Sequence, residues 1–279
     1  MPIKDILFLL IGEPDQATIA AIDKCVAVAG DFGARVVAIA IEEAILARPQ
    51  VISPDLDNSA AESAVRSVTD ARGLLKAFDS AAICIGLRNE QKFVRWAASD
   101  IASNLVHCAR LKDLSLLTVK PHDNRSEALI EQLLFKSGRP LLLCPEDRAA
   151  ELPAVFRHVV IAWDHSAPAA RAIADALPLL KTAETVRVVT ATQRKAPEEM
   201  KSGADLVAHL AEHGIKAGFE AVKIDGSSVG KVFEFFVRTN ATDLLVMGGY
   251  RHTRLNEIIW GGMTKTVIAQ PPCWVMMSR

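Results

Sequence analysis

Residues 157–163 read RHVVIAW, and residues 4–10 near the start of the chain read KDILFLL. Each stretch is an apolar run that follows a charged residue and precedes an alanine-rich segment with helical spacing. Apolar runs without strict alternation are typical of parallel strands that helices cover on both faces. The two stretches therefore predict two copies of one α/β unit.

Further apolar runs extend both copies. The first copy has candidate strands at 4–11, 35–41, 81–86, 114–119 and 140–144, and the second has them at 158–163, 186–192, 219–224, 243–248 and 273–277. Longer segments with helical spacing separate these runs, as in parallel sheets. We therefore expect two α/β domains, each a five-stranded, mainly parallel sheet with helices on both faces.

The domain boundaries follow from the segment between the copies. Residues 146–153 are mostly polar and end in Pro153, which makes them the best candidate for a linker. We place the domains at 1–147 and 154–279. The first copy is longer by roughly 20 residues between its second and fourth strands, which predicts an inserted loop or a helix extension, largely within 44–60.

Composition excludes several classes of protein. The 279 residues carry 32 basic and 33 acidic side chains, a net charge of -1, so no overall field attracts nucleic acid or an anionic membrane. No run of about 18 apolar residues is present. The five cysteines are scattered and form no close pair, which favours a reducing compartment and packing as small hydrophobes. We expect a cytoplasmic protein with no nucleic-acid or membrane partner.

The candidate site lies in the loops after strands one and four of the second copy, because ligands of open parallel sheets bind beyond the carboxyl ends of the strands. These loops contain Asp164-His165-Ser166 and residues 248–264. Glycines let the backbone approach a ligand closely, and amides at a helix start attract phosphate. Arg251, His252 and Arg254 would add positive charge, and Asp164 could accept hydrogen bonds from a ribose or an adenine.

These residues resemble the signature of the universal stress protein family. That signature is Gly-x-x-Gly, nine residues, then Gly and Ser or Thr, followed by a helix and a final strand of Pro-Cys-Pro-Val type. Here residues 248–264 and the segment AQPPCWV at 269–275 take those places. The resemblance implies two tandem Rossmann-like domains of the adenine-nucleotide hydrolase type. It also implies a stress-response regulator that binds ATP or a related adenine nucleotide, with Mg²⁺ carried by the phosphates.

The resemblance also assigns individual residues. Gly248 and Gly261 match the first and third signature glycines, and Asp164 matches the acidic residue that contacts the nucleotide. Arg251 stands in place of the second glycine, where it either blocks the phosphate path or binds phosphate. Gly262 stands in place of Ser or Thr. The implied nucleotide-binding set is Asp164, Ser166, Ala191, Gly248, Gly249, Arg251, His252, Arg254, Gly261, Gly262 and Thr264.

The first copy retains the pattern of the fold without that of the site. Ile11 aligns with Asp164, the loop at 120–127 is short, and residues 138–140 read GRP in place of Pro-Cys-Pro. We expect this half to bind no ATP and to serve as an internal dimer partner or to hold another ligand in its clefts. By resemblance, strands 140–144 and 273–277 meet in a pseudo-dimer; further homodimerisation and the identity of a protein partner stay open.

Other motifs carry no chemistry. Residues 226–232 read GSSVGKV, which has one residue too few between the glycines for a P-loop and predicts a helix-capping turn. The histidines lack metal-ligand spacing, and Cys273 in an apolar strand is expected to be buried and inert. No catalytic signature appears, so we expect at most slow ATP hydrolysis. The alternatives are a nucleotide-free scaffold whose site is lost through Arg251 and, less favoured, an adenylate-chemistry enzyme.

Overall fold

The structure is a computed structural model that describes residues 2–44, 54–193, 197–249 and 257–279, without the side chains of 43, 44, 54–64 and 257–261. Its elements are β1 (Asp5–Leu10), α1 (Gln16–Asp31), β2 (Arg35–Ala44), α2 (Pro54–Cys84), β3 (Asn89–Ala97), α3 (Ala98–Ala109), β4 (Leu114–Val119), α4 (Asn124–Lys136), β5 (Leu141–Pro145), the 3-10 helix η1 (Glu146–Glu151), β6 (His158–Ala162), α5 (Ala167–Leu180), β7 (Thr185–Thr192), α6 (Pro197–Glu212), β8 (Ala217–Lys223), α7 (Val229–Thr239), β9 (Leu244–Gly248), α8 (Glu257–Ala269) and β10 (Trp274–Ser278).

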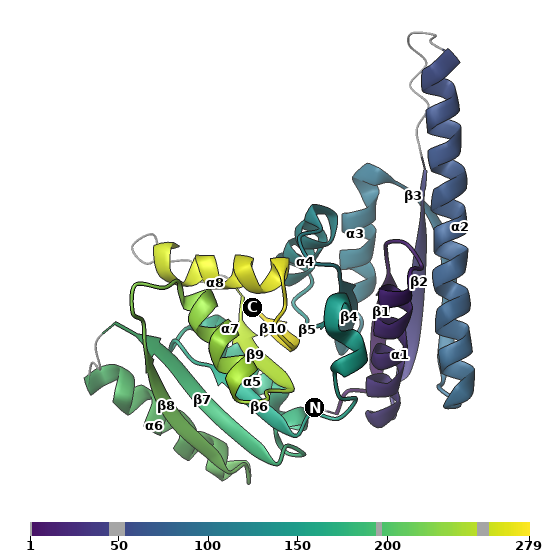
Figure 1. Ribbon diagram of the computed structural model, residues 1–279. Coiled ribbons are helices and arrows are strands. Elements are labelled where there is room, and N and C mark those ends of the chain that lie inside the picture. The colour runs from purple at the N-terminus through teal and green to yellow at the C-terminus, as the bar shows by residue number, and fades with distance from the viewer. Residues whose placement is uncertain (1, 45–53, 194–196, 250–256) are drawn as a thin grey trace.

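The strands of the described chain form one ten-stranded sheet with the order β3-β2-β1-β4-β5-β10-β9-β6-β7-β8. Strands are parallel within each half, and the halves join where β5 and β10 pair antiparallel, with Leu142 opposite Met276. This confirms the expectation that the last strands of the two copies meet. Because the pairing is antiparallel, the carboxyl ends of the strands in the two halves point to opposite edges of the sheet (Figure 1).

Helices cover both faces, as expected. Side chains of α1, α2, α5 and α6 share one hydrophobic core with one face of the sheet. Side chains of α3, α4, α7 and α8 share a second core with the opposite face. The central strands β4 and β5 are buried at every residue, which explains why their sequences are apolar without alternation. The fold class is therefore confirmed.

The candidate strand at 81–86 is wrong. Residues up to Cys84 belong to α2, where Ala82 faces the core while Ile83 is 71% exposed. The third strand of the first half is instead β3. It pairs with β2 at the edge of the sheet and is largely exposed. An exposed edge strand needs few apolar residues, so its sequence, NEQKFVRWA, lacks the pattern that marks the buried strands.

The extra length of the first copy is a helix extension. Helix α2 has 31 residues, whereas α6, its counterpart in the second copy, has 16. Figure 1 shows α2 projecting far beyond the carboxyl ends of the strands of its half. Of the predicted insertion at 44–60, residues 45–53 lie outside the described part of the chain.

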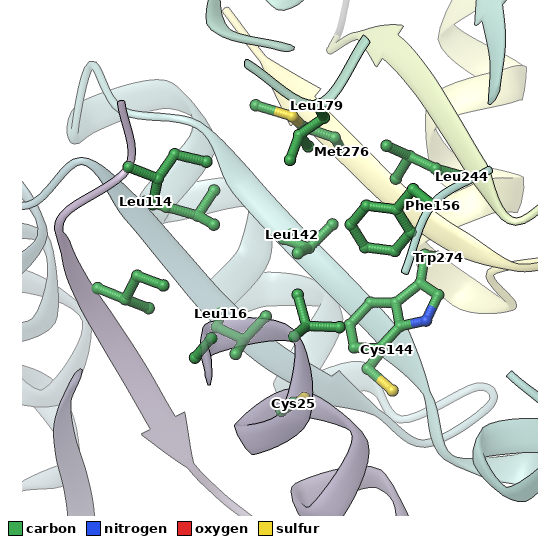
Figure 2. Packing of buried hydrophobic residues seen from close by; sticks show 14 of the residues in the cluster. Cys25, Leu114, Leu116, Leu142, Cys144, Phe156, Leu179, Leu244, Trp274 and Met276 are labelled. Carbon is green, nitrogen blue, oxygen red and sulfur yellow. The ribbon is translucent and has the colours of Figure 1, made fainter. Parts of the chain in front are cut away.

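The connection between the halves is packed against both of them. In η1 and the residue after it, Glu146, Ala149 and Leu152 are buried. The indole Nε1 of Trp274 donates to the carbonyl of Pro153 at 3.0 Å. Figure 2 shows Trp274, in the second half, between Phe156 and Cys144, where its ring meets that of Phe156 edge-on with centroids 5.7 Å apart.

Other expectations from the sequence have mixed outcomes. Residues 226–228 form the turn before α7, and Ser228 caps that helix by accepting from the Lys231 amide, which confirms the predicted capping turn. Burial raises the pKa of the Cys25 and Cys273 thiols, as expected for inert cysteines, whereas Cys84 is exposed, which contradicts its expected packing.

The described residues contain no cluster of metal ligands. In the same part of the chain, every helix is too short or too polar to cross a membrane.

The buried carboxyl of Glu146 makes stability depend on pH. Burial raises its pKa above the ordinary 4.5, assisted by the nearby Asp15, while hydrogen bonds from Thr118 and Thr18 oppose the shift. The folded chain therefore binds this proton more tightly than the unfolded chain does. The stabilising contribution is present at low pH and is lost as pH rises through the pKa of the folded state.

We therefore expect Glu146→Gln to raise the free energy of unfolding relative to the wild type near neutral pH, and to raise it less, or not at all, near pH 4.5. Urea denaturation at a series of pH values measures this difference. Glu151→Gln, an exposed change at the end of the same 3-10 helix, should leave the pH profile unchanged. A difference between Glu146→Gln and wild type that stays constant with pH would contradict the assignment.

Candidate functional site

The candidate site lies where the strand order of the second half reverses. Strand β6 pairs with β7 on one side and with β9 on the other. Ala162 lies opposite Met247, so the next residues along the two strands, Trp163 and Asp164, lie beside Gly248 and Gly249. Open α/β sheets bind ligands at such a reversal. The structure thus brings together the predicted aspartate and the first predicted glycines.

Asp164 begins a tight turn into α5. Its Oδ1 accepts a hydrogen bond from the Ser166 amide at 3.1 Å, and His165 between them has a left-handed backbone with φ of 60°. Ser166, a predicted nucleotide contact, caps α5 by accepting from the Ala169 amide at 3.2 Å. Within the described part of the chain, Oδ2 of Asp164 has no hydrogen-bond partner. One carboxylate oxygen therefore remains to accept a bond from a ligand.

Trp163, which was not among the residues predicted for the site, fixes this turn. Its Nε1 donates to Ser202 Oγ of α6 at 2.9 Å, and its carbonyl accepts from Thr190 Oγ1 at 2.9 Å. Its ring lies 5.7 Å from the ring of His165. An aromatic residue with a polar nitrogen directly before the aspartate was the available signal, because a buried indole needs a partner for its N–H.

Gly248 is required by packing. A Cβ at this position would lie 2.4 Å from the amide nitrogen of Ala169 and 2.6 Å from the carbonyl carbon of Pro168, both in the first turn of α5. Gly249 donates its amide to the Ser278 carbonyl at 2.8 Å, and a Cβ there would meet Leu134 of α4 at 2.3 Å. The two glycines thus seat the end of β9 between helices of both halves.

The remaining predicted residues come from β7, from α8 and from the segment between β9 and α8. Ala191 near the end of β7 and Thr264 in α8 are buried. Helix α8 begins at Glu257, so Gly261 and Gly262 lie in its second turn and not at its start, where phosphate-binding amides were expected. Gly262 is exposed, and a Cβ there would meet nothing within 4 Å. Arg251, His252 and Arg254 lie outside the described residues.

The equivalent position in the first half has different side chains. Leu9 lies opposite Leu117 in the pairing of β1 with β4, which puts Ile11 in the place of Asp164. Asp123 caps α4 by accepting from the amides of Arg125 and Ser126. A cavity of about 870 Å³ opens at this edge, with part of its wall formed by α2. Another ligand in this half was one expectation from the sequence, whereas the wall formed by α2 was not.

Comparisons with known proteins agree with this architecture. Residues 156–279 match the model of the Universal stress protein family. The fold is similar to that of a universal stress protein from Archaeoglobus fulgidus DSM 4304, with a TM-score of 0.65, 14% identity and 98% of each chain covered. It is also similar to a functionally unknown protein from Pseudomonas aeruginosa PAO1, with a TM-score of 0.60, 16% identity, and 99% of this chain and 92% of that chain covered. No curated protein sequence matches the chain.

Proposed function

We propose that the half of the chain that matches the model of the Universal stress protein family, residues 156–279, binds ATP or a related adenine nucleotide. The chain would then act as a nucleotide-dependent regulator in the stress response, in the cytoplasm and through a protein partner. We propose no catalytic step beyond, at most, slow ATP hydrolysis.

The observation that carries the proposal is the position of Asp164. Its carboxylate stands at the reversal of strand order, directly beside the end of β9, and keeps one oxygen without a partner among the described residues. The bonds of Trp163 to Ser202 and Thr190 hold the turn in place before any ligand binds. A carboxylate fixed in this way can accept hydrogen bonds from the hydroxyl groups of a ribose without first losing conformational freedom.

Gly262 gives secondary support. Glycine inside a helix costs about 1 kcal/mol relative to alanine. Among the described residues, no atom lies within 4 Å of where a Cβ at this position would be. Room for a ligand on the exposed face of α8 accounts for a glycine that packing does not require. In this proposal Mg²⁺ is held mainly by the phosphates.

Calorimetric titration with ATP and Mg²⁺ tests the proposal. We expect the wild type to bind and Asp164→Ala to weaken binding by about 10- to 100-fold, the scale of hydrogen bonds to a charged group. Asp225→Asn, an exposed aspartate whose carboxylate pairs with Lys223, serves as the control and should bind as the wild type does. The variants' thermal melting curves confirm that each is folded.

Arg251→Gly decides the role of the arginine. A gain in affinity would mean that Arg251 obstructs the phosphate path, and a loss would mean that it binds phosphate. If neither the wild type nor Arg251→Gly binds any adenine nucleotide, the proposal is wrong and the nucleotide-free scaffold takes its place.

A further inference from the structure

The first half contains a cavity of about 870 Å³ in the crevice between β1 and β4. This is the reversal of strand order in that half, because β1 pairs with β2 on one side and with β4 on the other. The volume lies within the range of about 300–1,000 Å³ typical of small-molecule sites. The cavity lies at the opposite edge of the sheet from Asp164, so it is separate from the proposed nucleotide site.

The lining of the cavity is mixed, with aliphatic side chains beside polar and charged ones. Leu10 comes from the end of β1, Leu74 from α2, Ile101 from α3 and Leu129 from α4, and all four are buried. Four different elements therefore contribute aliphatic surface to one space. Burying the apolar part of a ligand against such a lining is favourable by about 25 cal/mol per Å².

The charged side chains of the lining balance one another. Arg66, Lys120 and Arg125 carry three positive charges, and Glu13, Asp70 and Asp123 carry three negative charges. Some of these charges already have partners. Asp123 binds the first amides of α4, and Lys120 lies 3.5 Å from Asp15. The lining therefore offers no excess charge of either sign to a strongly charged ligand.

Phosphate groups are excluded more specifically. The helix starts nearest the strand ends are those of α1 and α4, and an aspartate of the chain itself caps each one. Asp15 accepts from the Thr18 amide at 2.8 Å, and Asp123 accepts from the Ser126 amide at 3.1 Å. These carboxylates occupy the amides that would attract a phosphate, and they repel it. Ile11 also replaces the carboxylate that a ribose would need.

We propose that this cavity binds a small amphiphilic molecule of no net charge, with its apolar body between α2, α3 and α4 and its polar end at the charged mouth. Helix α2 supplies one wall through Arg66, Asp70 and Leu74. The ligand is thus of a different chemical class from the nucleotide of the second half, and the two sites bind independently.

A pair of fluorescent probes that differ mainly in charge tests this assignment. N-phenyl-1-naphthylamine is uncharged, and 8-anilinonaphthalene-1-sulfonate adds one sulfonate to the same aromatic body. We expect the uncharged probe to bind the wild-type chain at one site with a dissociation constant of about 10 µM. The sulfonate should bind at least about fivefold more weakly. Saturating ATP and Mg²⁺ should displace neither probe, whether or not the second half binds nucleotide.

Two sets of variants locate the site. Ala128→Trp places a large ring at the mouth from an exposed position of α4 and should abolish binding of the uncharged probe. Ala211→Trp, an exposed alanine of α6 in the other half, is the matched control and should leave binding unchanged. Glu13→Gln with Asp70→Asn removes two negative charges from the lining and should strengthen sulfonate binding by about threefold to tenfold.

The proposal fails if the wild type does not bind the uncharged probe or if Ala128→Trp, shown to be folded by its melting curve, binds it as the wild type does. It also fails if the sulfonate binds more tightly than the uncharged probe, because the lining would then favour anions.

Discussion

Replacing Trp274 with alanine is expected to lower the free energy of unfolding by about 3–5 kcal/mol, the range for removal of a large buried aromatic side chain. Trp274 is fully buried in β10, at the junction of the two halves (Figure 2). The substitution removes the edge-on contact with Phe156 and leaves the Pro153 carbonyl without its donor. Urea denaturation followed by circular dichroism measures the loss.

Two control variants are needed. One separates the loss of ring packing from the loss of the hydrogen bond to Pro153, and the other measures the effect of removing an exposed ring. Trp274→Phe retains most of the ring volume and loses the hydrogen bond, so it should cost less than the alanine variant. Phe235→Ala removes an aromatic ring that is 71% exposed on α7 and should change stability by about 0.5 kcal/mol or less. A loss below about 1 kcal/mol for Trp274→Ala would show that the junction is not tightly packed.

The second large effect is expected at Gly248. The added methyl group of Gly248→Ala would lie 2.4 Å from a backbone nitrogen of α5, and backbone cannot rotate away as a side chain does. Forcing atoms into a packed region costs about 1–3 kcal/mol, and more where backbone must move. We therefore expect a loss of about 3 kcal/mol in the free energy of unfolding. Nucleotide binding should fall as well, because the shift of α5 would move the Asp164 turn.

Gly218→Ala is the control for Gly248→Ala. Gly218 lies in β8, and a Cβ there would meet nothing within 4 Å, so the substitution should be neutral or slightly stabilising. Equal stability of Gly248→Ala and the wild type would contradict the close approach of β9 and α5.

Burial explains which parts of the fold could be predicted from the sequence. Strands such as β4 and β6 are covered on both faces, so their composition alone marks them as strands. Strand β3 lies at the sheet edge and has mixed composition, whereas Ala81 to Cys84 at the end of α2 read as an apolar run. A short apolar run fits either a strand or a helix, and the structure shows that this one is the last turn of α2, where Ile83 is exposed.

The candidate site was predictable to a smaller extent. Asp164 and Gly248 could be paired in advance because they follow strands one and four of the same unit. The close contact between α5 and Gly248, which leaves no room for a side chain, could not be predicted. It depends on how closely the start of a helix packs over the end of a strand. The cavity of the first half depends in addition on a wall formed by residues 66–74 of α2, and no pattern in that stretch of sequence indicated a binding surface.

The antiparallel seam between β5 and β10 has a consequence for how such a molecule can diversify. In a twofold assembly of identical chains, every substitution appears in both subunits, so a change that suits one crevice is imposed on the other. Covalent fusion removes that constraint, because Ile11 and Asp164 occupy equivalent places yet are encoded separately. One half is then free to specialise while its twin continues to supply the complementary surface that keeps the pair folded.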